Sequence, residues 1–454
     1  PIENRAGSRW ILETSLGVLM MKKFFLVFVL ICLVFFLGCA KTHKTAKPQK
    51  KIVLWHWLTD REEALDGLAK KYEQITGIKI KCELYAPSDA YSQKIMAAGQ
   101  AKALPDIYGI LGEKRIFAAF IKAGHIADLT VDMEYNNGTW KNVFFKKALG
   151  VNEFLAGNKY GVKPGIYGVP VDVMNIQMLY NKRLFQQAGL DPRFPPRTWP
   201  DFITALEKLK QAGVKGLVGG WGETWMLDCF ANNYAFNIMG EEKVIDTISG
   251  KVPYNDPDWI EVFKLFDELA RKRLLVSGIV TMGNKTAEQL FANGKCGFAF
   301  NGSWCVNVYK SMNPDLEYGT MLPPAVSNRY PMAIWGGAGL SFLVNGRSNN
   351  KQEAINFLRW LTERKQQIFL SKQTMNLPSN KESLANIPEI LAQFADDMDY
   401  VTHPNILPVQ EDPHVLEALT KGIQAVIIGV KTPEQIADEV SKVKERVMKE
   451  EVKK

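Results

Sequence analysis

Two periodicities of apolar residues alternate along the chain from residue 51 onward. Residues 78–84 alternate apolar with charged side chains, which is the pattern of a half-exposed strand. Before them, Leu65, Leu68 and Tyr72 follow helical spacing, and Gly77 ends the predicted helix. Strands that alternate with helices in this way predict an α/β domain with a largely parallel sheet.

A long apolar stretch, residues 168–181, predicts a strand around which the rest of the chain is organised. A short helix closed by Gly189 follows, and a second helix begins at Thr198. Thr198 and Asp201 can bind the first free N–H groups of that helix, and Pro200 suits its first turn. Further along, Asn293-Gly294 predicts a turn between a helix and a strand.

The first fifty residues differ from the rest in charge and hydropathy. They hold eight Lys or Arg and two Glu, so the net charge of +8 falls to +2 for residues 51–454, which gives no nucleic-acid-binding signature. Met21-Lys22-Lys23 precedes an apolar run, residues 24–37, that is shorter than the ~20 residues of a membrane-spanning helix. This pattern predicts a signal peptide over residues 21–38, and residues 1–20 are interpreted as upstream sequence from an over-long gene prediction.

Leu37-Gly38-Cys39 resembles the lipobox of bacterial lipoproteins. Cys39 is therefore predicted to carry a lipid, and the polar residues 39–50 to form a flexible tether. The alternatives are a genuine N-terminal extension and an ordinary signal peptide that ends in a cysteine by chance. The prediction places an exported, lipid-anchored protein at the cell membrane, facing the periplasm or the extracellular space.

Motifs for catalysis and metal binding are missing from the sequence. There is no GxSxG, HExxH or P-loop, and the five histidines have no metal-ligand spacing, so no metal or cofactor is expected. Cys82, Cys229, Cys296 and Cys305 remain outside the signal, and their spacing leaves disulfides and free thiols equally open. A glycosidase needs only two carboxylates some ~5–10 Å apart, which a sequence does not exclude.

Several motifs occur in a joint order that is more specific than any one of them. These are Gly168-Val169-Pro170, Tyr180-Asn181, Ala188-Gly189-Leu190, Thr198-Trp199, Asn301-Gly302-Ser303-Trp304 and Trp335-Gly336-Gly337. Over residues 51–450 this order resembles the extracellular solute-binding proteins of ABC importers, in the sugar-binding family that includes maltose-type and glycerol-phosphate-type receptors.

The resemblance implies an α/β fold of the two-lobed periplasmic-binding-protein type II, with hinge crossings between two mixed or parallel sheets flanked by helices. Lobe one would comprise residues 51–172 and 315–373, and lobe two residues 174–312 and 375–454. Crossings near residues 173, 313 and 374 would form the hinge, and the protein would act as a monomer that delivers its ligand to ABC permease subunits.

Eleven tryptophans suggest what the ligand is. A sugar ring stacks its C–H face on an aromatic ring while polar groups bind its hydroxyls. Tryptophans beside glycines or at the ends of predicted elements suit such a cleft, and these are Trp57, Trp221, Trp225, Trp304 and Trp335. Trp55, Trp259 and Trp360 fall on apolar stripes and are expected in the core, and Trp199 is expected to anchor a helix start.

The resemblance adds polar candidates by position. Glu113, Asn301, Ser303, Gly336 and Gly337 match ligand-binding segments of the family, and Asp60 is a weaker match. Asp172 and Asn175 lie on the crossing strand, where a polar group could face the cleft.

One departure from the family pattern bears on the ligand. Val173 and Met174 stand where phosphate-binding relatives tend to place small hydroxyl residues, so a neutral sugar or oligosaccharide is favoured over glycerol phosphate. The expected function is therefore capture of a carbohydrate, without catalysis. An exported carbohydrate-active enzyme and a surface lipoprotein that only senses its ligand are the alternatives.

Overall fold

The computed structural model describes residues 50–111, 114–402, 407 and 410–452. The described residues from Lys51 onward form one compact unit. The predicted extension, the signal peptide, Cys39 and Glu113 lie outside the described residues, as does all of the tether except Lys50. Within the described ranges, no helix is both long and apolar enough to cross a membrane.

Ten strands join in one mixed sheet with the main order β2-β1-β3-β10-β6-β8-β7. They are β1 (Lys51–His56), β2 (Lys79–Leu84), β3 (Ile107–Tyr108), β6 (Val169–Asn181), β7 (Lys215–Gly219), β8 (Cys296–Gly302), β9 (Tyr318–Met321), β10 (Ile334–Val344), β11 (Leu377–Pro378) and β12 (Val401–Thr402). A separate pair consists of β4 (Glu153–Phe154) and β5 (Gly165–Ile166).

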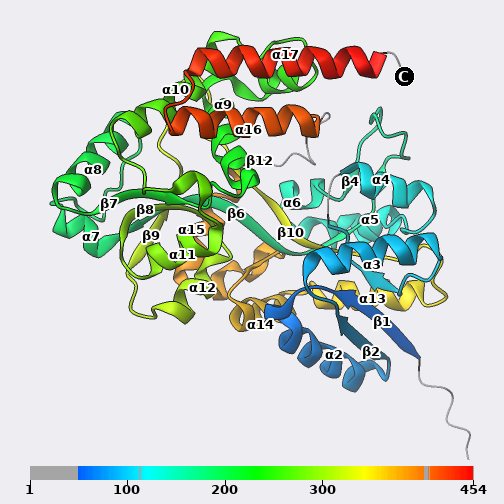
Figure 1. Ribbon diagram of the computed structural model, residues 1–454. Coiled ribbons are helices and arrows are strands. Elements are labelled where there is room, and N and C mark those ends of the chain that lie inside the picture. Colours follow the sequence, from blue (N-terminus) through cyan, green and yellow to red (C-terminus); the bar gives the residue numbers. More distant parts are fainter. Residues whose placement is uncertain (1–49, 112–113, 403–406, 408–409, 453–454) are drawn as a thin grey trace, which may run out of the picture. The chain divides into compact units, whose positions relative to one another are not determined.

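The strands β6 and β10 belong to both halves of this sheet (Figure 1). In the first half, β1 pairs in parallel with β2 and β3, and the end of β10 pairs with β3. In the second half, the end of β6 pairs with β8 and β9, and β7 pairs in parallel with β8. Because β6 and β10 also pair with each other, the two expected sheets are joined into one.

Helices surround each half of the sheet (Figure 1). The first half has α2 (Glu62–Thr76), α3 (Ser88–Gln100), α4 (Lys114–Lys122), α5 (Thr130–Gly138), α6 (Lys146–Gly150), α13 (Lys351–Leu361) and α14 (Arg364–Thr374). The second half has α7 (Lys182–Gln187), α8 (Trp199–Gln211), α9 (Thr224–Ile248), α10 (Pro257–Arg271), α11 (Asn284–Ala292), α12 (Cys305–Met312), α15 (Glu389–Asp396), α16 (Pro413–Ile427) and α17 (Pro433–Val452).

Local signals in the sequence explain where several of these elements begin and end. The Thr198 hydroxyl accepts a hydrogen bond from the Asp201 N–H at 3.3 Å, and a proline lies in the first turn of α8, both as predicted. The Asn293-Gly294 turn joins α11 to β8, and Gly294 has a φ of 64°, a conformation that glycine adopts at little cost.

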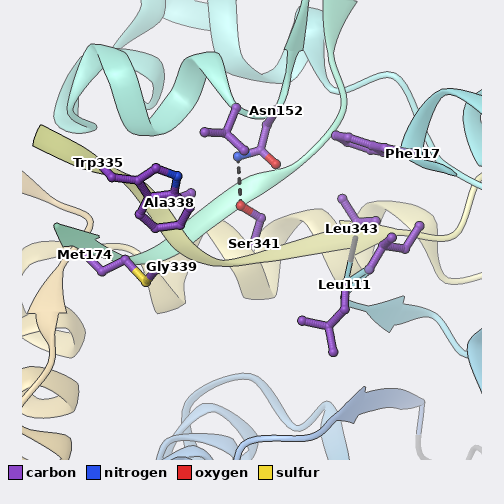
Figure 2. Close-up of a pocket in the computed structure, with 11 residues that line it drawn as sticks. Leu111, Phe117, Asn152, Met174, Trp335, Ala338, Gly339, Ser341 and Leu343 are labelled. Carbon is purple, nitrogen blue, oxygen red and sulfur yellow. Dashed lines mark hydrogen bonds between the residues drawn. The ribbon is translucent and has the colours of Figure 1, made fainter. Parts of the chain in front are cut away.

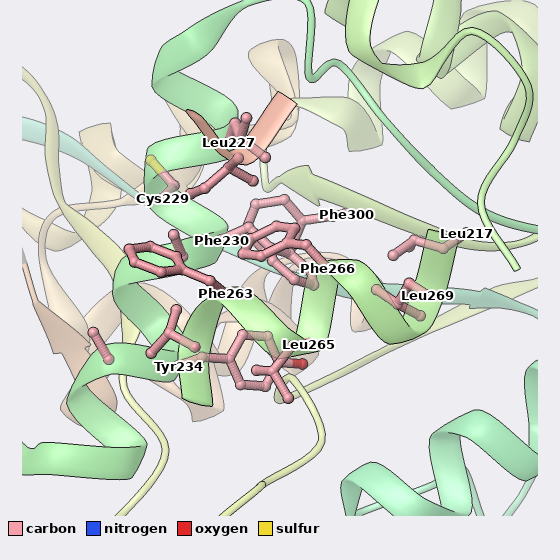
Figure 3. Packing of buried hydrophobic residues seen from close by; sticks show 14 of the residues in the cluster. Leu217, Leu227, Cys229, Phe230, Tyr234, Phe263, Leu265, Phe266, Leu269 and Phe300 are labelled. Atoms are coloured by element: carbon pink, nitrogen blue, oxygen red, sulfur yellow. The ribbon is translucent and has the colours of Figure 1, made fainter. Parts of the chain in front are cut away.

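Aromatic side chains fill the core of the second half (Figure 3). Phe230 of α9 packs edge-on against Phe300 of β8 with ring centroids 5.0 Å apart, and against Phe266 of α10 at 5.6 Å. Trp259 is 1% exposed, as its helical stripe predicts. These contacts attach α9 and α10 to the sheet and fix the start of α9, where part of the candidate site lies.

Strand pairing places one predicted segment differently. Residues 315–333 were expected in lobe one, but β9 pairs with Met178–Asn181 of β6, and Met321 and Met332 pack in the core around α9 and α10. The chain returns to the first half along β10 rather than near residue 313. The physical reason is that β10 runs through both halves of the sheet, so this one strand carries the chain from the second half back to the first.

Candidate ligand-binding site

Three of the predicted tryptophans lie together. Trp225 begins α9, Trp304 lies between β8 and α12, and Trp335 begins β10. The ring centroid of Trp225 is 6.0 Å from that of Trp304 and 6.5 Å from that of Trp335, with tilted planes. Trp225 is 42% exposed and the other two are half-buried, so this tryptophan cluster presents aromatic surface to solvent.

A cavity of about 270 Å³ shares Trp335 with the tryptophan cluster (Figure 2). It is lined by Ile110, Leu111, Phe117, Val151, Asn152, Met174, Trp335, Ala338, Gly339, Ser341 and Leu343. None of these side chains is charged. The amide Nδ2 of Asn152 donates to Ser341 Oγ at 2.8 Å across the lining, so polar groups are available beside the apolar ones (Figure 2).

Asn301 and Trp304 bind one buried carboxylate, that of Glu288. Asn301 Nδ2 donates to Glu288 Oε1 at 3.1 Å, and Trp304 Nε1 donates to the same oxygen at 3.2 Å. Burial raises the pKa of Glu288, although these hydrogen bonds oppose the rise. Asn301 also donates to the Tyr309 hydroxyl at 3.1 Å, so its amide group supports the site from inside the protein.

A second cavity, of about 240 Å³, also has Trp335 in its lining. Aliphatic and aromatic side chains together make up most of this lining, and the carboxylates of Asp228 and Glu411 are its charged groups among the described residues. Glu411 pairs with Lys444 at 2.6 Å, and Asp228 accepts a hydrogen bond from Asn232 at 2.7 Å. Burial raises the pKa of Asp228 to about 7, and the charge of Glu411 adds to this rise.

Replacing Asp228 by asparagine should flatten the pH dependence of stability. The raised pKa means that the folded protein binds this proton more tightly than the unfolded chain does, so the stabilisation is complete below the ordinary aspartate pKa of 3.8 and is lost as the pH rises through about 7. At ~1.4 kcal/mol per pKa unit, wild type should lose up to about 4 kcal/mol relative to Asp228→Asn across this window. Urea unfolding of both proteins at the low and the high end of this pH window measures the difference in stability. The control is Glu241→Gln, exposed on the same helix, and parallel profiles of Asp228→Asn and wild type would contradict the assignment.

Residues 67–400 match the sequence model of the bacterial extracellular solute-binding protein family. The chain belongs to this family. The sn-glycerol-3-phosphate-binding periplasmic protein UgpB of Agrobacterium fabrum is 26% identical over 343 residues, which cover 72% of this chain and 74% of UgpB.

Solved structures of binding proteins share the fold of this solute-binding protein. A chitin oligosaccharide binding protein superposes with a TM-score of 0.69 at 21% identity, covering 88% of this chain and 99% of its own. Unliganded RafE from Streptococcus pneumoniae gives a TM-score of 0.71 at 17% identity, covering 87% and 97%. These likenesses confirm the predicted type II fold.

Trp221 lies in the core of the solute-binding protein, not in its candidate site. It is 0% exposed, and its ring packs edge-on against Phe230 at 5.0 Å and Phe266 at 5.7 Å. The glycines around it, which suggested a loop at the cleft, instead allow close packing, because a Cβ at Gly220 would lie 2.6 Å from Asn284 Cα. We therefore leave Trp221 out of the proposed site.

Asp172 and Asn175 do not line either cavity. Asp172 is 3% exposed, pairs with Arg61 at 2.6 Å and accepts a hydrogen bond from the Leu340 N–H at 2.6 Å. Asn175 is fully buried and donates to the Phe394 carbonyl at 2.7 Å. Both polar side chains therefore connect elements around the crossing strand instead of facing a ligand.

The remaining candidates have structural partners. Trp57 is half-buried against Tyr91 with centroids 4.9 Å apart, and exposed Asp60 binds Arg61 at 2.9 Å; neither lines the 270 Å³ cavity. Ser303 and Gly337 are buried. At Gly336 a Cβ would lie 2.7 Å from the Met174 carbonyl oxygen, so the glycine permits close strand packing.

The sequence did not identify Asn152, Ser341 or Phe117 as lining residues. Each is an ordinary residue type with no local signal of a site. They reach one cavity only because α4, the segment between α6 and β4, and β10 pack together. Among the residues that the structure describes, no group of three or more His, Cys, Asp or Glu is placed to hold a metal ion. The four cysteines outside the signal are free thiols here.

Proposed function

We propose that this solute-binding protein is the carbohydrate receptor of an ABC importer and captures a neutral sugar or oligosaccharide. The observation that carries the proposal is the tryptophan cluster of Trp225, Trp304 and Trp335 beside an uncharged cavity. Aromatic faces suit the C–H surface of a sugar ring, and amide and hydroxyl groups such as those of Asn152 and Ser341 suit its hydroxyls.

Glycerol phosphate is the second candidate, because a relative is named for it. Proteins bind phosphate with Arg or Lys side chains or helix N-termini. None of the described residues that line the two cavities is basic. Lys114, on the same helix as Phe117, donates to the carbonyls of Val151 and Glu153 at 2.7 Å each, and burial lowers its pKa to about 7. These features favour an uncharged ligand.

Binding without turnover is part of the proposal. The family and the structural relatives are binding proteins, and a glycosidase would need a pair of carboxylates around the bound sugar. The tryptophan cluster has Glu223 and Glu288 nearby, but both bind indole N–H groups. Incubating pure protein with oligosaccharides should release no new reducing ends.

Ligand binding is proposed to close two lobes about β6, β10 and residues 375–378. Few backbone dihedrals need to change at three crossings, and a ligand that contacts both lobes shifts the population towards the closed form. Trp335 and the loop after β3 would then approach from opposite sides of the ligand. Solution scattering should show a smaller radius of gyration with ligand than without it.

The cellular setting follows from the N-terminal sequence. Leu37-Gly38-Cys39 after the apolar run supports an exported protein held at the membrane by a lipid on Cys39, with residues 39–50 as a tether to reach the permease. Wild-type protein that is fully soluble and begins at another residue would contradict the anchor.

A thermal-shift panel tests the function. Neutral mono- and oligosaccharides and sn-glycerol 3-phosphate are compared at equal concentrations, and a ligand at 100 times its dissociation constant stabilises the folded state by ~2.7 kcal/mol. We expect at least one neutral oligosaccharide to raise the melting temperature and glycerol phosphate to leave it unchanged. The opposite pattern would contradict the proposal.

A further inference from the structure

Two indoles of the tryptophan cluster each bind a carboxylate through their N–H group. Trp225 Nε1 donates to Glu223 Oε2 at 3.1 Å, and Trp304 Nε1 donates to Glu288 Oε1 at 3.2 Å. An indole whose N–H is held in this way has one preferred ring orientation, which fixes the face that it presents to a ligand.

Asn284, the first residue of α11, connects the two carboxylates. Its backbone N–H donates to Glu223 Oε1 at 2.7 Å, and its side-chain Nδ2 donates to Glu288 Oε1 at 2.9 Å. The connection needs a close approach of two loops. It is possible because Gly220 has no Cβ, which would lie 2.6 Å from Asn284 Cα, and because a Cβ at Gly222 would lie 2.6 Å from the Thr281 carbonyl carbon.

Three hydrogen bonds of the connection meet at one buried carboxylate oxygen, Glu288 Oε1. Glu288 is 7% exposed, and its Oε1 receives hydrogen bonds from Asn284, Asn301 and Trp304. A buried carboxylate oxygen that accepts three hydrogen bonds holds its donors in place, because losing any one of them leaves charge that water does not reach. The orientation of Trp304 is therefore coupled to that of Trp225 through Glu288, Asn284 and Glu223.

We propose that Glu223, Asn284 and Glu288 are positioning residues that set the affinity for the ligand by fixing the mutual orientation of Trp225 and Trp304. They act through the indoles and not by contact with the ligand. This inference rests on the proposed carbohydrate function of the same site. It predicts that the affinity depends on side chains behind the tryptophan cluster, even when both rings are present.

The test uses the full chain with Glu223→Ala, Asn284→Ala and Glu268→Ala. Glu268 is a matched control, because its Oε2 accepts the indole N–H of Trp199 at 2.8 Å, the same kind of bond at a tryptophan that lines neither cavity. Calorimetric titration of the neutral oligosaccharide that gives the largest thermal shift should show the dissociation constant rising about tenfold for the first two variants and staying unchanged for the control. Glu223→Gln keeps one acceptor oxygen, so its dissociation constant should lie between those of Glu223→Ala and wild type.

Near-ultraviolet circular dichroism gives a second readout that needs no ligand. Two indoles 6.0 Å apart couple their transitions, so the signal should change in Glu223→Ala and Asn284→Ala while the melting temperature stays close to that of wild type. Wild type that binds no carbohydrate would overturn the proposed function. Wild type that binds, with both variants within twofold of it and an unchanged dichroism spectrum, would overturn the positioning role alone.

Discussion

Trp225→Ala is expected to weaken carbohydrate binding by about 2 kcal/mol or more, roughly 30-fold in dissociation constant, and to leave the free energy of unfolding nearly unchanged. The ring of Trp225 is 42% exposed and packs only loosely against Trp304 and Trp335, so its removal opens no cavity in the core. Calorimetric titration and urea unfolding of the same preparation separate the two quantities.

Trp221→Ala is the matched comparison, four residues earlier in the chain. Its ring is fully buried against Phe230 and Phe266, so truncation should cost ~3–5 kcal/mol of stability and act on binding only through the fold. If Trp225→Ala and Trp221→Ala lose stability and affinity to the same extent, the tryptophan cluster serves only packing and the ligand-binding site lies elsewhere.

Asp172→Ala is expected to destabilise the protein by ~3–5 kcal/mol, because it removes the buried partner of the Arg61 guanidinium and leaves only the more exposed carboxylate of Asp60 beside it. The pair joins the segment after β1 to β6 at 2.6 Å, and the other Asp172 oxygen accepts the Leu340 N–H of β10. Gly339 makes room for this carboxylate, since a Cβ there would lie 2.5 Å from Asp172 Oδ1, at an irregularity in the β6–β10 pairing.

Asp60→Ala provides the control for that result. Asp60 binds the same guanidinium at 2.9 Å but its side chain is 39% exposed, so its loss should cost no more than about 1 kcal/mol. The comparison is made by urea unfolding at neutral pH. If the two variants lost equal free energy of unfolding, burial would not be the reason for the stabilisation by the Arg61–Asp172 pair.

The sequence predicted features that depend on near neighbours in the chain. The cap at Thr198, the turn at Asn293-Gly294 and the buried stripe of Trp259 are local patterns, and each is confirmed. The family order of motifs also predicted the fold, although Trp225, Trp304 and Trp335 come together only through α9, β8 and β10.

The errors arise where distant partners decide the outcome. Trp221 and Trp225 belong to the same glycine-rich stretch of sequence, and only the packing of α9 and α10 makes one a core residue and leaves the other exposed. Asp172 looked free to face a ligand because its partner, Arg61, lies far earlier in the chain. The course of the chain after residue 313 likewise depends on distant partners, because β9 pairs with β6 before β10 begins.

A crystal structure of the protein bound to the oligosaccharide that stabilises it most would test the central claim most directly. The account predicts a sugar ring stacked on the tryptophan cluster, with its hydroxyls towards the cavity that Asn152 and Ser341 line. A ligand bound elsewhere, or one whose contacts with the cluster are made only by charged groups, would contradict it.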